Sequence, residues 1–315
     1  MLHLRLIVPP DRTEPVVGAI ERTVGTTHLV VLAGAARNPS GDLVMCDVAR
    51  EAGDELIGRL RDLGLDRDGA ISVETTDLSL SKRADKAEKE APGEPADAVL
   101  WEQLTEATHE ESTLSVTYLA FLTLATMIAA CGVLLDNAIL IVGAMAVGPE
   151  FGPLAGFSTA VVQRLPRLAL RSLVALVVGF AVAMAVTVVF SLFMNGVGLF
   201  EFSMLEGDRP DTAFIYDPDA FSFVVAVLAG IAGTLSLTSA KSGALVGVAI
   251  SVTTVPAAAN AAVALSYGDY VQAGGSSRQL LLNLVGIIMA GTLTLLVQKW
   301  LWTRRRRAMS KPAEA

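Results

Sequence analysis

The sequence predicts an α-helical polytopic membrane domain that follows a small α+β domain. Hydrophobic residues make up 52% of the 315 residues and charged residues 18%, but the two kinds are unevenly distributed. The first 76 residues alternate between strand and helix periods, whereas the second half holds six apolar segments long enough to cross a bilayer. We therefore expect a water-soluble part and a membrane part.

The soluble part has the element order βαββαβ. "LHLRLIV" and "HLVVLAG" alternate like strands, and the apolar residues between them recur at helical spacing. "LVMCDV" indicates a third strand, "EAGDELIGRLRDLG" a helix with a glycine stop, and "AISVETT" a fourth strand. This order predicts a ferredoxin-like domain over residues 1–76, with four antiparallel strands and two helices on one face. We interpret it as a cytosolic regulatory or assembly domain.

Charge and cysteine usage limit the partners of this domain. Residues 1–111 contain 12 Lys and Arg against 22 Asp and Glu, and this acidic balance without a basic stripe argues against nucleic acid. Cys46 and Cys131 lie in different parts of the chain, so we expect free thiols, and the N-terminus has too short an apolar run for a signal peptide. His3, His28 and His109 are scattered singly, and we expect each to be structural or on the surface.

Two connecting segments follow. Residues 77–98 are charged, small and proline-containing, without an apolar periodicity, and are expected to form a linker. Residues 99–111 are expected to form a juxtamembrane helix, because Leu100, Leu104 and Ala107 fall on one side of it.

Six spans are predicted within residues 112–303. They lie near residues 113–135, 137–163, 168–194, 220–240, 243–266 and 279–302. If the N-terminal domain is cytosolic, ten of the twelve Lys and Arg after residue 111 fall on the cytosolic side, several of them in the basic tail 304–315. The positive-inside rule therefore predicts a multi-pass protein of the cell (inner) membrane with both termini in the cytosol.

The second span contains helix breakers and a carboxylate. Within "GAMAVGPEFGPLAG" we expect the helix to be interrupted and to bind a ligand or ion through Gly148, Pro149, Glu150, Gly152 and Pro153. Proline removes a main-chain donor and displaces a carbonyl, and lipid cannot satisfy the groups that are freed. An ionisable residue inside the membrane usually faces a cavity, a partner or a proton route.

The fifth span repeats this pattern. Sliding the chain by 104 positions places "GPEFGP" on "VTTVPA", and in each half an uninterrupted segment, a proline-broken one and another uninterrupted one follow in turn. Because three spans are an odd number, this predicts an inverted 3+3 repeat whose broken second and fifth helices meet near the midplane and form the binding site. The second half would contribute Ser251, Thr253, Thr254, Pro256 and Asn260.

Other interpretations of the same residues remain open. Prolines also kink membrane helices in proteins that transport nothing, and glycines spaced as Gly148, Gly152 and Gly156 also let helices pack closely. Glu150 is a candidate for proton or cation coupling or for hydrogen bonding to a ligand, or it caps a half-helix. Asp136 and Asn137 are expected to have a structural role, as an N-cap in the hairpin between the first two spans.

One family shares the hairpin motif. The stretch "STLSVTYLAFLTLATMIAACGVLLDNAILIVGAMAVGPEFGPLAG" resembles the bacterial and archaeal hydrophobic membrane proteins catalogued as domain of unknown function 389. The positions that match the family pattern are Asp136, Asn137, Gly143, Ala144, Met145, Pro149, Gly152 and Pro153. The likeness extends over the soluble domain and all six segments, although Glu150 and Phe151 stand where the family commonly has two large apolar residues. The resemblance implies an architecture and little chemistry.

The favoured function is a transporter or channel-like carrier of a small solute or ion. The alternative is a membrane-anchored sensor or oligomeric scaffold, in which the soluble domain binds a small ligand, and an enzyme acting on lipid is a third and weaker reading. We find no nucleophile–base pair and no metal-ligand spacing, so we predict no catalytic residue, metal or cofactor. The expected partners are the lipid bilayer, a small-molecule ligand and further copies of the chain in a homo-oligomer.

Overall fold

The computed structural model describes residues 1–76, 78–91, 93, 98–207, 209–210, 212–216, 220–239 and 253–309. The chain divides into two compact units. The first comprises Met1–Gln103 with Thr238–Ala240, and the second comprises Leu104–Leu237 with Lys241–Ala315. We describe each unit separately.

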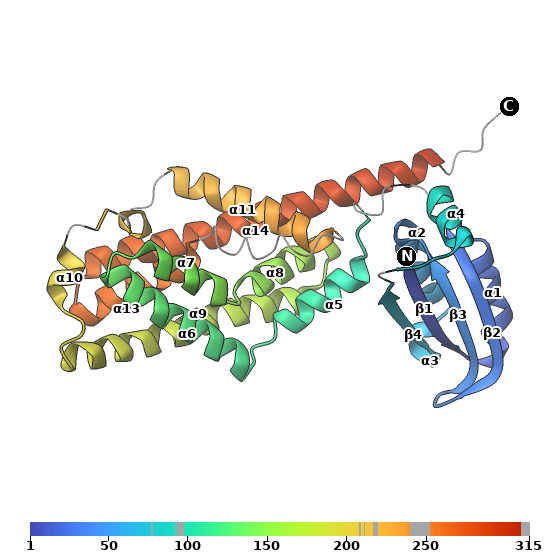
Figure 1. Cartoon of the computed structure of the whole chain (residues 1–315), viewed down its shortest axis with the longest axis horizontal. Helices are drawn as coiled ribbons and strands as arrows, with labels where there is room; N and C mark the ends of the chain where they lie inside the picture. Colours follow the sequence, from blue (N-terminus) through green and yellow to red (C-terminus); the bar gives the residue numbers. More distant parts are fainter. Residues whose placement is uncertain are drawn as a thin grey trace. The chain divides into compact units, whose positions relative to one another are not determined.

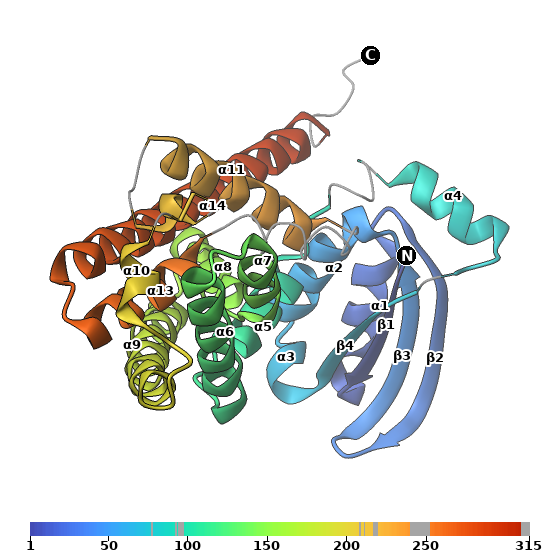
Figure 2. The same cartoon turned by 60° about the vertical axis from the view of Figure 1, so that its left-hand side comes forward.

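The first unit is built on a four-stranded antiparallel sheet. Its main elements are β1 (Leu2–Val8), α1 (Thr13–Glu21), β2 (Thr26–Arg37), β3 (Ser40–Val48), α2 (Arg50–Asp62) and β4 (Ala70–Thr75), with the short η1 (Pro10–Arg12) and α3 (Leu65–Asp68) between them. The strand order is β2-β3-β1-β4 (Figure 2). The order of the main strands and helices is therefore the predicted βαββαβ.

Alternation along the strands produces the core of this unit. Leu2, Leu4 and Leu6 of β1 are buried, whereas the residues between them are not. The buried β1 side chains join the apolar faces of α1 and α2 in one cluster. Successive side chains of a strand point to opposite faces, so the helices cover one face of the sheet.

Two histidines that lie far apart in the sequence meet on the sheet. Nδ1 of His3 and Nδ1 of His28 each lie 2.7 Å from a different carboxylate oxygen of Asp47. Burial alone would raise the pKa of Asp47, but the hydrogen bonds from His28 and His3 outweigh it, and the pKa is lowered. These histidines are structural, as expected, but they form a cluster.

The structure differs from the expectation within residues 77–98. A helix, α4 (Lys82–Glu90), begins at Ser81, which caps it, and packs against β2 and β3. Its buried residues are alanines, Ala84 and Ala87. The linker prediction missed this helix because such small side chains give little apolar signal in a charged segment. It is followed by α5 (Trp101–Glu111).

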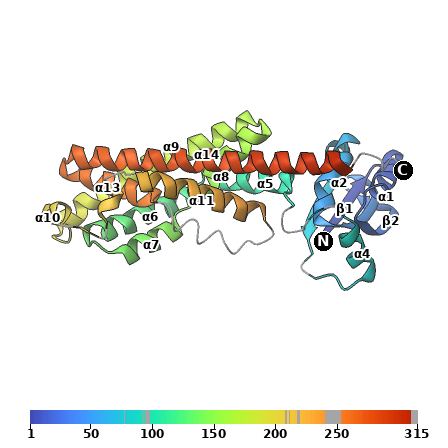
Figure 3. The same ribbon diagram turned by 90° about the horizontal axis from the view of Figure 1, so that it is seen from above.

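The second unit consists of apolar helices. Its elements are α6 (Val116–Leu134), α7 (Ala138–Val147), α8 (Phe151–Gln163), α9 (Pro166–Gly196), α10 (Phe202–Glu206), η3 (Ala213–Ile215), α11 (Ala220–Thr238), α13 (Thr254–Tyr267) and α14 (Tyr270–Met309). Figures 1 and 3 show the long helices lying side by side, with the shorter ones among them. Among the described residues, α6, α9, α11 and α14 are long and apolar enough to cross a membrane, and α7 with α8 forms a fifth, bent candidate. A membrane protein is thus indicated.

The described residues contain four candidate spans, or five with the bent pair, so the six-span prediction is supported only in part. The first half of the fifth span, 243–252, lies outside the described residues, so only its second half is seen, as α13. The last helix begins at Tyr270, before the predicted 279, because Asp269 accepts a hydrogen bond from the amide of Gln272 and caps α14. Residues 266–278, which were expected to connect the fifth and sixth predicted spans, are therefore largely helical.

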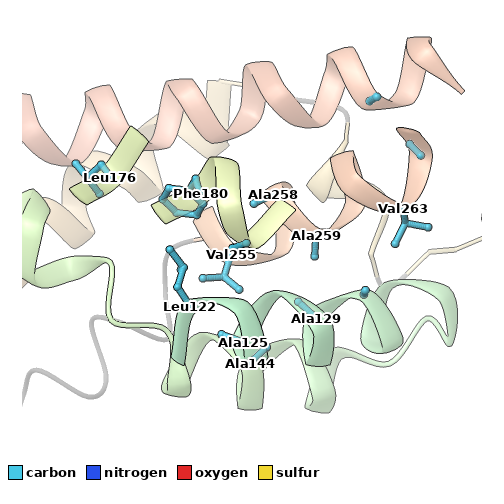
Figure 4. Close-up of a cluster of buried hydrophobic side chains, with 14 of the residues drawn as sticks. Leu122, Ala125, Ala129, Ala144, Leu176, Phe180, Val255, Ala258, Ala259 and Val263 are labelled. Carbon is cyan, nitrogen blue, oxygen red and sulfur yellow. The ribbon is translucent and has the colours of Figure 1, made fainter. Parts of the chain in front are cut away.

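Small residues place α13 in the middle of the second unit. Val255, Ala258 and Ala259 lie in the same buried cluster as Leu122 and Ala125 of α6 (Figure 4). Helix α13 also packs against α9 and α14. Alanine side chains allow this close approach of several helices, since without large side chains the backbones can come together.

Ala259→Leu should therefore destabilise the protein. Ala259 is fully buried, and adding volume to a filled core costs about 1–3 kcal/mol because neighbours are displaced. Thermal unfolding of the purified full-length protein in detergent should show a lower Tm. Ala120→Leu makes the same change at an exposed position of α6 and should leave Tm unchanged. Equal Tm values for both variants would contradict the central position of α13.

Candidate functional site

A sharp interruption separates α7 from α8. The two helices are bent by 52° at the break. Gly148 has φ −65° and ψ 129°, an extended conformation, and it directly precedes Pro149. A residue before proline is driven out of the helical region by the proline ring, so the chain leaves the helix at this residue. Pro153 is the third residue of α8, where the main-chain donor is not needed within the helix.

The Glu150 side chain crosses this break to the second half of the sequence. Its Oε1 accepts a hydrogen bond of 2.7 Å from Oγ1 of Thr254, at the start of α13. Glu150 is only 5% exposed. Although Glu150 is the N-cap residue of α8, its side chain makes no capping hydrogen bond within the described part of the chain. The carboxyl group thus links the break between α7 and α8 to the start of α13.

Gly148 makes room for this link. A Cβ atom at this position would collide with Oε2 of Glu150 and would lie 2.9 Å from Cγ2 of Val255. Any larger residue would displace either the carboxyl group or α13. Glycine is therefore required at position 148, because the main chain there lies close to both Glu150 and α13.

Amides from α14 complete the polar groups at the start of α13. Oγ1 of Thr253 accepts hydrogen bonds from Nδ2 of Asn283 at 2.9 Å and from Nε2 of Gln279 at 3.4 Å. Both amide residues are almost fully buried. Gln279 and Asn283 were not among the binding residues predicted from the sequence. The signal that could have found them is the presence of lone amides in an otherwise apolar span.

Two helix N-termini converge at this place. Both α8 and α13 begin here, and each carries a proline as its third residue, Pro153 and Pro256. The N-terminus of a helix has free main-chain donors and a partial positive charge of about half a unit. Oε2 of Glu150 and Oε1 of Gln279 have no hydrogen-bond partner among the described residues. The site thus combines free donors with free acceptors in an apolar surrounding.

A cavity of about 440 Å³ reaches the break. It is lined by residues from the end of α5, the start of α6 and both sides of the break: Glu110, Glu111, Thr113, Ser115, Thr117, Tyr118, Phe121, Ala146, Gly148, Pro149, Phe151, Gly152 and Leu237. Gly152 has the side chain of Glu111 directly against it, and Gly156 lies against Ser112 and Ser172. Gly156 therefore serves close packing, whereas Gly152 belongs to the cavity wall.

Asn260 belongs to a second polar cluster. Its Nδ2 donates to Oγ of Ser276 at 2.6 Å, and its Oδ1 accepts from Nη1 of Arg209 at 3.2 Å. Asn260 follows Thr254 by six residues, which is about 9 Å along a helix. The structure thus divides the predicted residues into a break cluster with Glu150 and an Arg209 cluster with Asn260.

Arg209 is the central residue of that second cluster. It is 3% exposed, and its guanidinium lies 5.0 Å from the centre of the Tyr216 ring. Burial lowers its pKa, while Tyr216 and Asp136 offset part of this effect. Nε and Nη2 have no hydrogen-bond partner in the described residues. Arg209 was not among the binding residues predicted from the sequence.

The remaining predicted residues lie at the hairpin or outside the described chain. Oδ1 of Asn137 accepts from the amides of Ile139 and Leu140 and so caps α7. Asp136 has a positive φ of 45° and accepts a hydrogen bond from Thr212. Ser251 lies outside the described residues. In the described ranges, no group of three His, Cys, Asp or Glu residues could hold a metal ion.

Thr254→Val should weaken the contact between Glu150 and the start of α13. The variant keeps the shape of the side chain and removes the hydroxyl that Glu150 binds. Leaving a buried acceptor unpaired costs about 1–3 kcal/mol, so thermal unfolding of the full-length protein should begin at a lower temperature. Thr294→Val is the control, because that hydroxyl bonds only to a carbonyl of its own helix in the described structure. A Thr254→Val protein as stable as the control would argue against the link.

Comparison with known proteins agrees with the hairpin motif. Residues 145–289 match the family described as Domain of unknown function (DUF389). The match includes Met145, Pro149, Gly152 and Pro153 of the motif, but neither the soluble domain nor α6 lies within it.

A curated relative extends the comparison. An uncharacterized protein of Methanocaldococcus jannaschii is 24% identical to the chain over 200 residues, which are 64% of this chain and 60% of the relative. The chain thus matches less than two thirds of the length of that relative. No solved structure matches the chain. The resemblance of the hairpin motif to the DUF389 family is thus confirmed by the match over residues 145–289.

Proposed function

We propose that the protein is a carrier whose binding site lies where the two interrupted spans meet. The observation that carries the proposal is the hydrogen bond between Glu150 and Thr254. It joins the break between α7 and α8 to the start of α13, in the other half of the chain. Two acceptor oxygens beside it, Oε2 of Glu150 and Oε1 of Gln279, have no partner among the described residues. In secondary transporters, discontinuous helices that meet near the membrane midplane form the substrate and ion sites.

An inverted repeat accounts for this meeting. Helix α8 packs against α9 and α14, and α13 packs against the same two helices. The starts of α8 and α13, Phe151 and Thr254, are 103 residues apart, within one residue of the offset that aligns the two breaks in the sequence. The starts of two helices related by a two-fold axis touch only near that axis. The Glu150–Thr254 contact is what such an axis would produce.

The two sides of the site differ in access. The cavity reaches Gly148 and Gly152 from the end of α5. On the other side of the break, along α13, Asn260 is bound by the buried Arg209. In our proposal this conformation is open toward α5 and closed by the Arg209 cluster. Opening of that cluster would expose the site to the opposite side, as alternating access requires.

Orientation and assembly complete the proposal. The distribution of Lys and Arg supports a cell-membrane protein with both termini in the cytosol, so the α5 side would be cytosolic. The N-terminal domain, with its ferredoxin-like element order, would regulate the carrier or assemble it into a homo-oligomer. The proposal includes no catalytic step. The alternative, a ligand sensor or scaffold without transport, requires no passage through the site.

Glu150→Gln should impair transport. Full-length protein is first screened by thermal shift for small ions and solutes that raise Tm, and each one found is then followed into proteoliposomes. The variant keeps the size and an acceptor oxygen but removes the ionisable group. We expect its exchange rate to fall by at least about tenfold, which corresponds to roughly 1.4 kcal/mol of barrier.

Two results would decide against the carrier. Glu206→Gln, at an exposed residue of α10, should transport like the wild type, and an equal loss in this variant would make the Glu150 effect unspecific. Wild-type vesicles that exchange none of the stabilising solutes would favour the sensor or scaffold.

A further inference from the structure

The cavity beside the break has a distinctive lining. Its only charged lining residues in the described structure are two carboxylates, Glu110 and Glu111. Hydroxyl groups of Thr113, Ser115 and Thr117 add polar atoms. Three aromatic rings, Tyr118, Phe121 and Phe151, line the same space. Acidic groups together with aromatic faces are the environment in which proteins bind organic ammonium ions, because both attract a positive charge.

Arg171, a basic residue that contacts the lining residue Thr113, is already bound elsewhere. Nη1 of Arg171 lies 2.7 Å from Nε2 of His109, and its Nη2 donates to Oγ1 of Thr113 at 2.5 Å. Arg171 therefore lies behind Thr113 and is not part of the cavity lining. Glu110 and Glu111 therefore have no ion-pair partner in the described structure.

The two carboxylates at the cavity mouth repel each other. The Glu111 side chain is exposed but lies against Gly152. The partial loss of solvent there raises the pKa of Glu111, and the negative charge of Glu110 adds to the effect. A positive charge bound between them would remove this repulsion. The charges that line the cavity therefore favour binding of a cation over an anion.

The helix N-termini do not reverse this preference. Their partial positive charges, about half a unit each, already face the Glu150 carboxyl group. Oε2 of that carboxyl group lies directly against Gly148, which lines the cavity, and has no partner in the described residues. The inner end of the cavity, at Gly148, therefore lies next to a buried acceptor.

We propose that the cavity binds a small organic cation, with Glu110 and Glu111 as the counter-ions of its ammonium group. This inference rests on the proposed carrier function and names the substrate class of the same site. The cavity volume of about 440 Å³ suits a small organic molecule, since ligand sites range from roughly 300 to 1,000 Å³. The aromatic rings would contact the alkyl groups of the cation.

Three probes of one shape test the charge preference. Choline, the neutral 3,3-dimethylbutan-1-ol and the anionic 3,3-dimethylbutyrate are titrated into the full-length protein in detergent, and Tm is measured at constant chloride. We expect choline to raise Tm at concentrations at least about tenfold lower than either analogue, a ratio of the size that one favourable charge interaction produces. Equal stabilisation by the alcohol or the butyrate, or by potassium chloride alone, overturns the proposal.

Variants of the lining separate a charge effect from a folding effect. Glu110→Gln combined with Glu111→Gln should abolish the choline shift, whereas Glu106→Gln, in the same helix but outside the lining, should retain it. Thr117→Lys places a positive charge in the cavity and should also abolish the shift. A choline shift that survives both the double variant and Thr117→Lys overturns the proposal.

Transport measurements distinguish the failure of each claim. Choline that binds through Glu110 and Glu111 but is not exchanged across vesicles supports the cation site and contradicts the carrier. Exchange of the butyrate in a Glu150-dependent manner supports the carrier and contradicts the cation preference. Choline exchange that depends on Glu110, Glu111 and Glu150 supports both.

Discussion

The second unit depends on a hydrogen bond between a buried carboxyl group and a helix from the second half of the chain. The break between α7 and α8 exposes main-chain groups that lipid cannot satisfy, and Glu150 lies at this break. Thr254, at the start of α13, donates to Glu150, and Thr253 accepts from two amides of α14. These contacts hold the start of α13 against the break.

Packing follows from this meeting. Helix α13 can reach Glu150 only by passing through the middle of the unit, and its alanines allow that path. Gly148 has the corresponding role on the other side, since a single Cβ atom there would separate the two spans. Small residues and polar residues thus act together: the former let the backbones approach and the latter hold them in register.

The polar groups of the unit fall into two clusters with different surroundings. The break cluster adjoins a cavity with an acidic lining, whereas the Arg209 cluster buries a guanidinium against Tyr216 and Asn260. A buried arginine is costly unless its surroundings compensate it, and two of its nitrogens lack a described partner. The break cluster likewise contains two atoms without a partner among the described residues, Oε2 of Glu150 and Oε1 of Gln279.

The sequence by itself determined the elements that local patterns encode. Long apolar runs identified α6, α9 and α11, alternation identified the strands of the sheet, and Pro149 located the break, because hydropathy and backbone sterics act over a few residues. The sequence did not identify α4, whose buried side chains are alanines, or the early start of α14, which Asp269 caps. Only the tertiary structure decided that Glu150 meets Thr254, that Gln279 and Asn283 reach Thr253, and that Arg209 reaches Asn260. These partners lie on segments that are separated in the chain, so their contacts depend on how the helices pack and leave no local sequence pattern.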